Sequence, residues 1–177
     1  MSWTPTTAVV IIALAVLLDF SGVAYAADFG FELTEVTSGE QVTAESSSQG
    51  KPVVVHIWSA NCPHCRLHMP YAAKLYSELD PEVAGFVSIC VDATPEEARR
   101  YIAERELAFP VLLEESGWLG DDYLKLGWPT TFVLNPDGTL AGYSDTQGPQ
   151  YITEVLELAG QSQPETETVV IRDVEIS

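Results

Sequence analysis

The pattern of apolar and polar positions predicts strands and helices that alternate along the chain. Residues 53–58 form a short apolar run interrupted only by His56, as expected for a strand buried on both faces. Residues 63–79 carry apolar positions at helical spacing. The residues expected on the buried side of this helix are Leu67, Tyr71, Leu75 and Leu79. Pro70 lies inside the helix, where it removes a hydrogen bond and should kink it.

The remaining pattern completes an α/β domain with a central mixed sheet flanked by helices. Alternating apolar positions in 29–43 predict an N-terminal β-hairpin, and the Ser-rich stretch 44–50 is predicted to be a loop. Thr94 and Glu97 form a capping box that starts a helix. Further strands are predicted at 83–91, 109–113, 130–134 and 139–143, and further helices at 94–107, 117–126 and 149–158.

The first 26 residues are typical of a secretory signal peptide. Their apolar run, Ala8 to Leu18, is 11 residues long and too short to span a bilayer, and Ala24-Tyr25-Ala26 fits a cleavage site. No Lys or Arg precedes the run, so an uncleaved membrane anchor is the alternative. We therefore predict an exported protein, periplasmic or otherwise extracytoplasmic, in a compartment where disulfides persist.

Composition divides the rest of the chain into one domain, 27–160, and an acidic C-terminal tail, 161–177. The chain has 26 acidic and 8 basic residues, for a formal net charge of −18. This charge disfavours nucleic acid and anionic membrane surfaces as partners. The acidic residues are spread over many segments, as expected of a solvated surface.

Two cysteines lie two residues apart where the strand at 53–58 meets the following helix. Asn61 is predicted to cap the helix, and Pro63 fits its first turn because the missing N–H would be unpaired there. Cys62 thus lies at a helix N-terminus, whose partial positive charge favours thiolate over thiol. We predict that Cys62 is a nucleophile and that Cys65 is the resolving thiol.

A zinc site is the alternative use of two such cysteines. It would need a second Cys/His pair at ligand spacing, and Cys90 is the only other cysteine of the chain. Cys90 lies on the apolar strand 83–91, where a small core residue is the favoured interpretation.

Residues 58–65, Trp-Ser-Ala-Asn-Cys-Pro-His-Cys, resemble a thioredoxin-fold active site. The flanking sequence, from about residue 29 to 159, resembles the TlpA/ResA-like branch of extracytoplasmic thiol-disulfide oxidoreductases. The motifs that carry this resemblance are Gly50-Lys51-Pro52, Met69-Pro70, Gly127-Trp128-Pro129-Thr130-Thr131-Phe132 and Asn135-Pro136-Asp137-Gly138. The resemblance implies a thioredoxin-like fold in which Pro129 is cis and lies against the dithiol.

The resemblance also implies the activity. It predicts a thiol-disulfide oxidoreductase that exchanges disulfides with protein substrates through Cys62 and Cys65, without a cofactor or a bound metal. A membrane or secreted redox partner would reset the dithiol. Cytochrome c maturation, oxidase assembly and general disulfide housekeeping are all open as its role.

Three histidines lie near the dithiol in the sequence. His64 lies between the cysteines, as in the disulfide-forming oxidase DsbA, and an imidazolium there stabilises the thiolate and raises the reduction potential. His56 stands where thioredoxins have a buried acid, so it is a candidate to accept or relay the Cys65 proton. A hydrogen-bonded core histidine is the alternative for His56. His68 stands where many ResA-like proteins carry a glutamate.

The candidate substrate-binding residues are Trp58, Trp128, Pro129 and Thr130. In the family, the backbone of the residue before the cis-proline pairs with the substrate peptide. That residue is Trp128 here, where small or β-branched residues are usual, and a surface aromatic in a loop is the alternative interpretation.

Two other functions would use the same residues differently. A Cu(I)-binding metallochaperone would take Cys62, Cys65 and either His64 or His68 as ligands. Relatives of that kind use a wider CxxxC spacing and a distant histidine. A thiol peroxidase would need a lone peroxidatic cysteine in a loop rich in Pro and Thr, which this sequence lacks.

Overall fold

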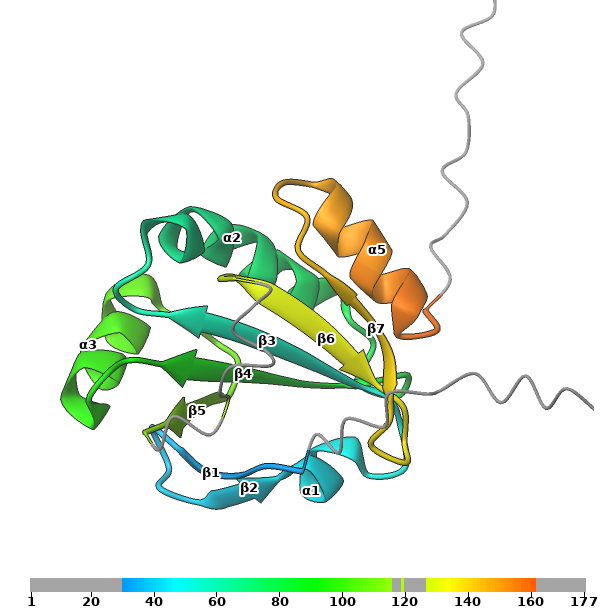
Figure 1. Ribbon diagram of the computed structural model, residues 1–177, viewed down its shortest axis with the longest axis horizontal. Coiled ribbons are helices and arrows are strands. Elements are labelled where there is room, and N and C mark those ends of the chain that lie inside the picture. The colour runs from blue at the N-terminus through cyan, green and yellow to red at the C-terminus, as the bar shows by residue number, and fades with distance from the viewer. Residues whose placement is uncertain (1–29, 116–118, 120–126, 162–177) are drawn as a thin grey trace, which may run out of the picture.

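A seven-stranded mixed sheet forms the centre of the molecule (Figure 1). The computed structural model describes residues 30–115, 119 and 127–161. The strand order is β2, β1, β5, β4, β3, β6, β7. The strands are β1 (Glu32–Glu35), β2 (Gln41–Thr43), β3 (Val53–Ser59), β4 (Gly85–Val91), β5 (Val111–Glu114), β6 (Thr130–Leu134) and β7 (Leu140–Ser144). The helices are α1 (Ala44–Ser48), α2 (Pro63–Glu78), α3 (Pro95–Arg105) and α5 (Gln150–Leu158).

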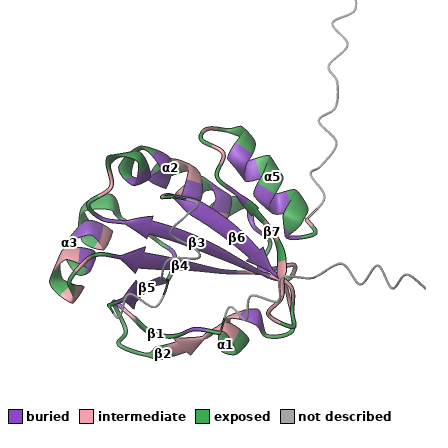
Figure 2. Cartoon of the chain, in the orientation of Figure 1, coloured by how far each residue is buried: buried purple, intermediate pink, exposed green. Residues whose placement is uncertain are grey.

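Strand β3 lies at the centre of this sheet, between β4 and β6. It pairs with β4 in parallel and with β6 in antiparallel orientation, and all seven of its residues are buried (Figure 2). The hairpin of β1 and β2 pairs with the sheet through β5. The predicted α/β class, the mixed sheet and the N-terminal hairpin are therefore confirmed.

Side chains of β3 alternate between two hydrophobic clusters, because successive residues of a strand point to opposite faces. Val54 and Trp58 belong to the cluster that packs against α2, α3 and α5. Val55 and Ile57 belong to the cluster on the other face, to which Phe31 also contributes. His56 shares the face of Val54 and Trp58, and thus points toward the helices.

The predicted loop at 44–50 is wrong, because α1 occupies most of it. The Thr43 hydroxyl accepts a hydrogen bond from the Ser46 backbone N–H, and the Ser46 hydroxyl accepts one from the Thr43 backbone N–H. This reciprocal cap satisfies two unpaired donors at the first turn and lets a Ser-rich segment form a helix. The capping box of Thr94 and Glu97 at the start of α3 is confirmed.

The predicted buried side of α2 is wrong at Leu67, which is 74% exposed. A strict four-residue spacing advances about 40° beyond a full turn at each step, so it drifts around the helix. The side chains of α2 that are buried are Cys65, His68, Met69, Ala72 and Leu75. This face brings one cysteine and one histidine into the core.

Three predicted segments lie outside the described residues. They are the signal segment 1–26, nearly all of the helix at 117–126, and the tail from residue 162 onward. Within the ranges that the structure describes, no helix combines the length and the apolar character needed to cross a membrane.

Candidate active site

The dithiol lies where β3 ends and α2 begins. Cys62 is the N-cap of α2, and its Sγ accepts a hydrogen bond from the backbone N–H of Cys65 at 3.3 Å. The prediction that Asn61 caps this helix is wrong, since its side chain instead donates to the Asp92 carbonyl at 3.0 Å. The sulfur therefore receives a backbone donor at the positive end of the helix, which favours negative charge on it.

The two thiols differ in their exposure to solvent. Cys62 is partly exposed, whereas Cys65 is completely buried, and both are free thiols. Burial, together with the hydrogen bond to Cys62, raises the pKa of the Cys65 thiol to about 12. Only Cys62 of this pair presents its sulfur to a partner molecule, and Cys65 reacts only if another group removes its proton.

A segment distant in sequence lies against Cys62. The Trp128–Pro129 peptide bond is cis, as the resemblance implies, and the Cys62 thiol donates a long hydrogen bond of 3.9 Å to the Trp128 carbonyl. Pro129 is buried and Trp128 is half-buried. The Thr130 hydroxyl donates to the Gly127 carbonyl at 2.8 Å, and this hydrogen bond joins the two ends of the segment 127–130.

Trp58, a predicted substrate-binding residue, lies in the core. Its side chain is completely buried, and its indole N–H donates to the Ser88 hydroxyl at 2.6 Å. Its ring lies 4.8 Å from the ring of Tyr101, between centroids. Trp58 is the sixth residue of a strand that is covered on both faces. Its indole therefore packs in the core and is not exposed to solvent. Thr130 is likewise buried.

A buried polar cluster surrounds His56. His56 Nδ1 lies 2.8 Å from the Thr131 hydroxyl, which in turn lies 2.8 Å from the Tyr151 hydroxyl. Nε2 of His56 has no hydrogen-bond partner in the part of the chain that the structure describes. Burial, and to a lesser degree His68, lowers the pKa of His56 to about 3. The imidazole is therefore neutral at neutral pH.

His68 adds a second buried imidazole to this cluster. Its ring stacks on that of His56 with centroids 5.5 Å apart, and it meets the Tyr151 ring edge-on at 4.4 Å. Neither ring nitrogen has a partner among the described residues, and burial lowers the pKa of His68. Sequence reasoning missed Tyr151 and Thr131, because only the pairing of His56 with Thr131 across β3 and β6 brings them to this site.

His64 and Cys90 occupy opposite environments. His64 is exposed on the first turn of α2, and its side chain forms no hydrogen bond within the described ranges. Cys90 is buried in β4, where its thiol donates to the Val91 carbonyl at 3.8 Å. Burial raises the pKa of the Cys90 thiol to about 12, so this cysteine belongs to the core.

Metal ligation finds no support in the described part of the chain. It contains no group of three or more His, Cys, Asp or Glu side chains that could hold a metal ion. The Cu(I) chaperone alternative needs such a group at the dithiol.

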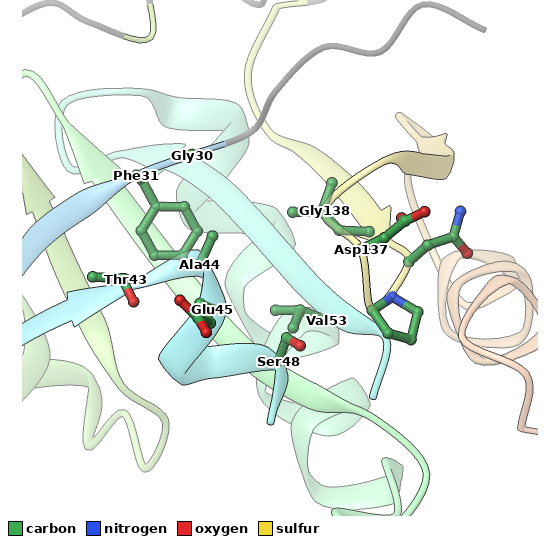
Figure 3. A pocket seen from close by; sticks show the side chains of 12 residues that line it. Gly30, Phe31, Thr43, Ala44, Glu45, Ser48, Val53, Asp137 and Gly138 are labelled. Carbon is green, nitrogen blue, oxygen red and sulfur yellow. The ribbon is translucent and has the colours of Figure 1, made fainter. Parts of the chain in front are cut away.

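A cavity of about 490 Å³ lies where β3 begins, at the end of the strand away from the dithiol (Figure 3). Phe31, Ser48, Val53 and Asp137 are among the residues that line it. It contains no cysteine or histidine, and it lies about 20 Å from the dithiol, since β3 rises by about 3.3 Å per residue. It therefore adds nothing to the chemistry of the thiols.

Comparison with known proteins gives both sequence and structural relatives. The profile of the AhpC/TSA family matches residues 25–142. The thiol-disulfide oxidoreductase ResA of Oceanobacillus iheyensis is 32% identical over 113 residues, which cover 62% of this chain and 58% of ResA. The chain thus spans little more than half the length of that relative.

Two solved structures resemble the fold. The thioredoxin domain of a thiol-disulfide oxidoreductase from Bacteroides vulgatus gives a TM-score of 0.62 at 21% identity, covering 73% of this chain and 93% of that one. StoA from Bacillus subtilis gives a TM-score of 0.59 at 22% identity, covering 75% and 98%. The predicted thioredoxin-like fold is confirmed.

Proposed function

The chain belongs to the AhpC/TSA family, and from that premise we propose that it exchanges disulfides with protein substrates through Cys62 and Cys65. One observation carries the proposal: a partly exposed sulfur at a helix N-terminus is paired with a buried thiol one turn into the same helix. The similarity to ResA and the thioredoxin-like fold support the same activity.

Exchange proceeds through a mixed disulfide. The Cys62 thiolate attacks one sulfur of the substrate disulfide, the substrate S–S bond breaks, and the first substrate thiolate leaves. Cys65, once deprotonated, attacks the Cys62 sulfur and releases the second substrate thiolate. The products are a reduced substrate and a Cys62–Cys65 disulfide, so two electrons pass to the substrate. The reverse sequence oxidises a substrate dithiol.

The buried imidazoles are the proposed proton relay for the second step. A thiol with a pKa near 12 needs a proton acceptor close by, and both imidazoles are neutral at neutral pH. His68 lies three residues after Cys65 on the buried side of α2, a spacing that brings side chains within about 5–6 Å on a helix. We assign these imidazoles the role of relaying the Cys65 proton, since burial lowers the pKa of His56 to about 3 and it cannot hold the proton.

The segment before Pro129 is the proposed contact for the substrate backbone. The Trp128 carbonyl faces the Cys62 sulfur, and the half-buried Trp128 side chain leaves part of an aromatic surface beside it. A peptide whose cysteine reaches Cys62 therefore passes this segment.

The proposed location is outside the cytoplasm, where residues 1–26 would direct or anchor the protein. A membrane or secreted redox partner would then restore the dithiol. Cytochrome c maturation is one process that uses such exchange.

Catalysed reduction of insulin disulfides by dithiothreitol tests the activity. Wild type should accelerate reduction, Cys62→Ser should abolish the acceleration, and Cys90→Ala should retain it. A protein that turns over peroxide but leaves insulin disulfides intact would be a thiol peroxidase, and this result would overturn the proposal.

A further inference from the structure

Basic residues gather at one place beside the dithiol, although the chain as a whole is strongly acidic. Three of the 8 basic residues, Arg66, Arg100 and Arg105, line a single cavity of about 100 Å³. The residues that line the cavity come from α3, from the segment that joins β3 to α2, and from the first turn of α2. We propose that this arginine cavity binds a carboxylate of the substrate next to its reacting cysteine, an inference that rests on the proposed function.

A buried tyrosine, Tyr101, forms part of the wall of the same cavity. Tyr101 is only 7% exposed, and its hydroxyl has no hydrogen bond to any described residue. The ring is fixed by packing against Trp58 and by the Arg105 guanidinium, which lies 5.7 Å from the ring centroid. The hydroxyl has almost no solvent-accessible area, so Tyr101 forms part of a fixed cavity wall against which Arg105 packs.

Two of the guanidinium groups keep donors free for a ligand. Arg66 donates through Nε and Nη2 to the Ala60 carbonyl, at 3.2 and 3.1 Å, and its Nη1 has no hydrogen bond to a described residue. Arg105 stacks on Tyr101 and forms no ion pair within the ranges described. A planar guanidinium with free N–H groups matches the geometry of a carboxylate.

The acidic residues of the cavity already have partners. The Glu97 carboxylate accepts hydrogen bonds from the backbone N–H and the hydroxyl of Thr94, in the cap of α3. Glu104 pairs with Arg100 at 3.9 Å. Three guanidinium groups against two engaged carboxylates leave an excess of positive charge, and the volume of about 100 Å³ suits one carboxylate group.

The cavity lies close in sequence to the reactive cysteine. Ala60 and Asn61 line it and directly precede Cys62, so the Cα atoms of Ala60 and Cys62 are at most about 7 Å apart. A residue close in sequence to the substrate cysteine therefore reaches the cavity while that cysteine reacts. The net charge of −18 disfavours acidic partners elsewhere on the surface. The arginine cavity is then a local site that selects cysteines with a neighbouring Asp or Glu.

Two matched peptides test the proposal on the reduced full-length protein. Each carries one cysteine blocked as a 2-thiopyridyl disulfide, and the neighbouring residue is Glu in one peptide and Gln in the other. We expect wild type to release thiopyridone from the Glu peptide roughly threefold to tenfold faster at low salt. About 1 M salt should reduce this ratio, because screening weakens the attraction.

Arg105→Gln should bring the ratio of the two rates close to one. Arg99→Gln is the matched control: it removes the same charge from the same helix, but Arg99 contacts the Val36 carbonyl and Glu96 and lies outside the cavity. It should keep the wild-type ratio. Equal rates for the two peptides in wild type, or equal effects of Arg99→Gln and Arg105→Gln, would overturn the arginine cavity as a carboxylate site.

Failure of the proposed function gives a different result, since neither peptide would then react through Cys62. A further experiment asks whether the cavity binds the carboxylate of a peptide substrate or that of a small thiol such as glutathione. It compares the 2-thiopyridyl disulfide of glutathione with that of glutathione diethyl ester. A preference for the free acids that depends on Arg105, with no preference between the peptides, would overturn the assignment to peptide substrates.

Discussion

Mild acid should destabilise the folded protein, because two of its three histidines are buried. The pKa of His56 is about 3 in the folded chain against an ordinary 6.5. Between these values the unfolded chain binds a proton at His56 that the folded chain does not. The free energy of unfolding is therefore highest above pH 6.5 and falls as the pH drops from 6.5 toward 3.

The magnitude follows from the two pKa values. Between pH 7.5 and pH 5.0, His56 alone should lower the free energy of unfolding by about 2 kcal/mol. Burial also lowers the pKa of His68, so His68 adds to the loss in the same direction. Carboxyl groups, with ordinary pKa values near 4, bind few protons above pH 5, which leaves this window to the histidines.

Urea unfolding of the reduced protein at pH 7.5, 6.5, 5.5 and 5.0 measures the effect. Wild type should lose at least about 2 kcal/mol over this range, and His56→Asn should lose about 2 kcal/mol less. His64→Gln, at an exposed position, serves as the control and should retain the wild-type loss. A flat profile in wild type would refute the reasoning even if His56→Asn does not fold.

Three further predictions concern the thiols, a helix cap and the reduction potential. Iodoacetamide at neutral pH should label Cys62 first, because burial raises the pKa values of Cys65 and Cys90 to about 12; peptide mapping that finds Cys90 labelled as fast would contradict this. Thr94→Ala should lower the free energy of unfolding by about 1 kcal/mol in urea titrations, since α3 loses its cap, and an unchanged midpoint would contradict it. Equilibration with glutathione should give a potential between about −270 and about −120 mV that falls in His64→Pro. A wild-type value at or below about −270 mV, unchanged in the variant, would mean that His64 does not set it.

Local sequence features predicted the centre of the fold and the dithiol. The apolar run of β3 and the capping box of α3 each involve residues close together in the sequence, so local patterns are enough to predict them. The cysteine pair is equally local. Helix α1 was missed because Ser-rich composition favours a loop, whereas the reciprocal cap of Thr43 and Ser46 decides the outcome.

Features that depend on packing between distant segments could not be predicted. The cluster of His56, Thr131 and Tyr151 joins β3, β6 and α5, and it depends on the register of β3 against β6. The exposure of Leu67 depends on which face of α2 meets the sheet. Trp58 looks like a site residue because it precedes the dithiol closely, but the coverage of both faces of β3 places it in the core.

The central claim is that Cys62 forms a mixed disulfide with a protein substrate and that Cys65 resolves it. Reduced Cys65→Ser protein can be mixed with insulin, quenched with acid and analysed by intact mass spectrometry without a reductant. We expect one insulin molecule linked through Cys62 in Cys65→Ser, only a transient adduct in wild type, and none in Cys62→Ser. No adduct in Cys65→Ser, or an adduct on Cys90, would contradict it.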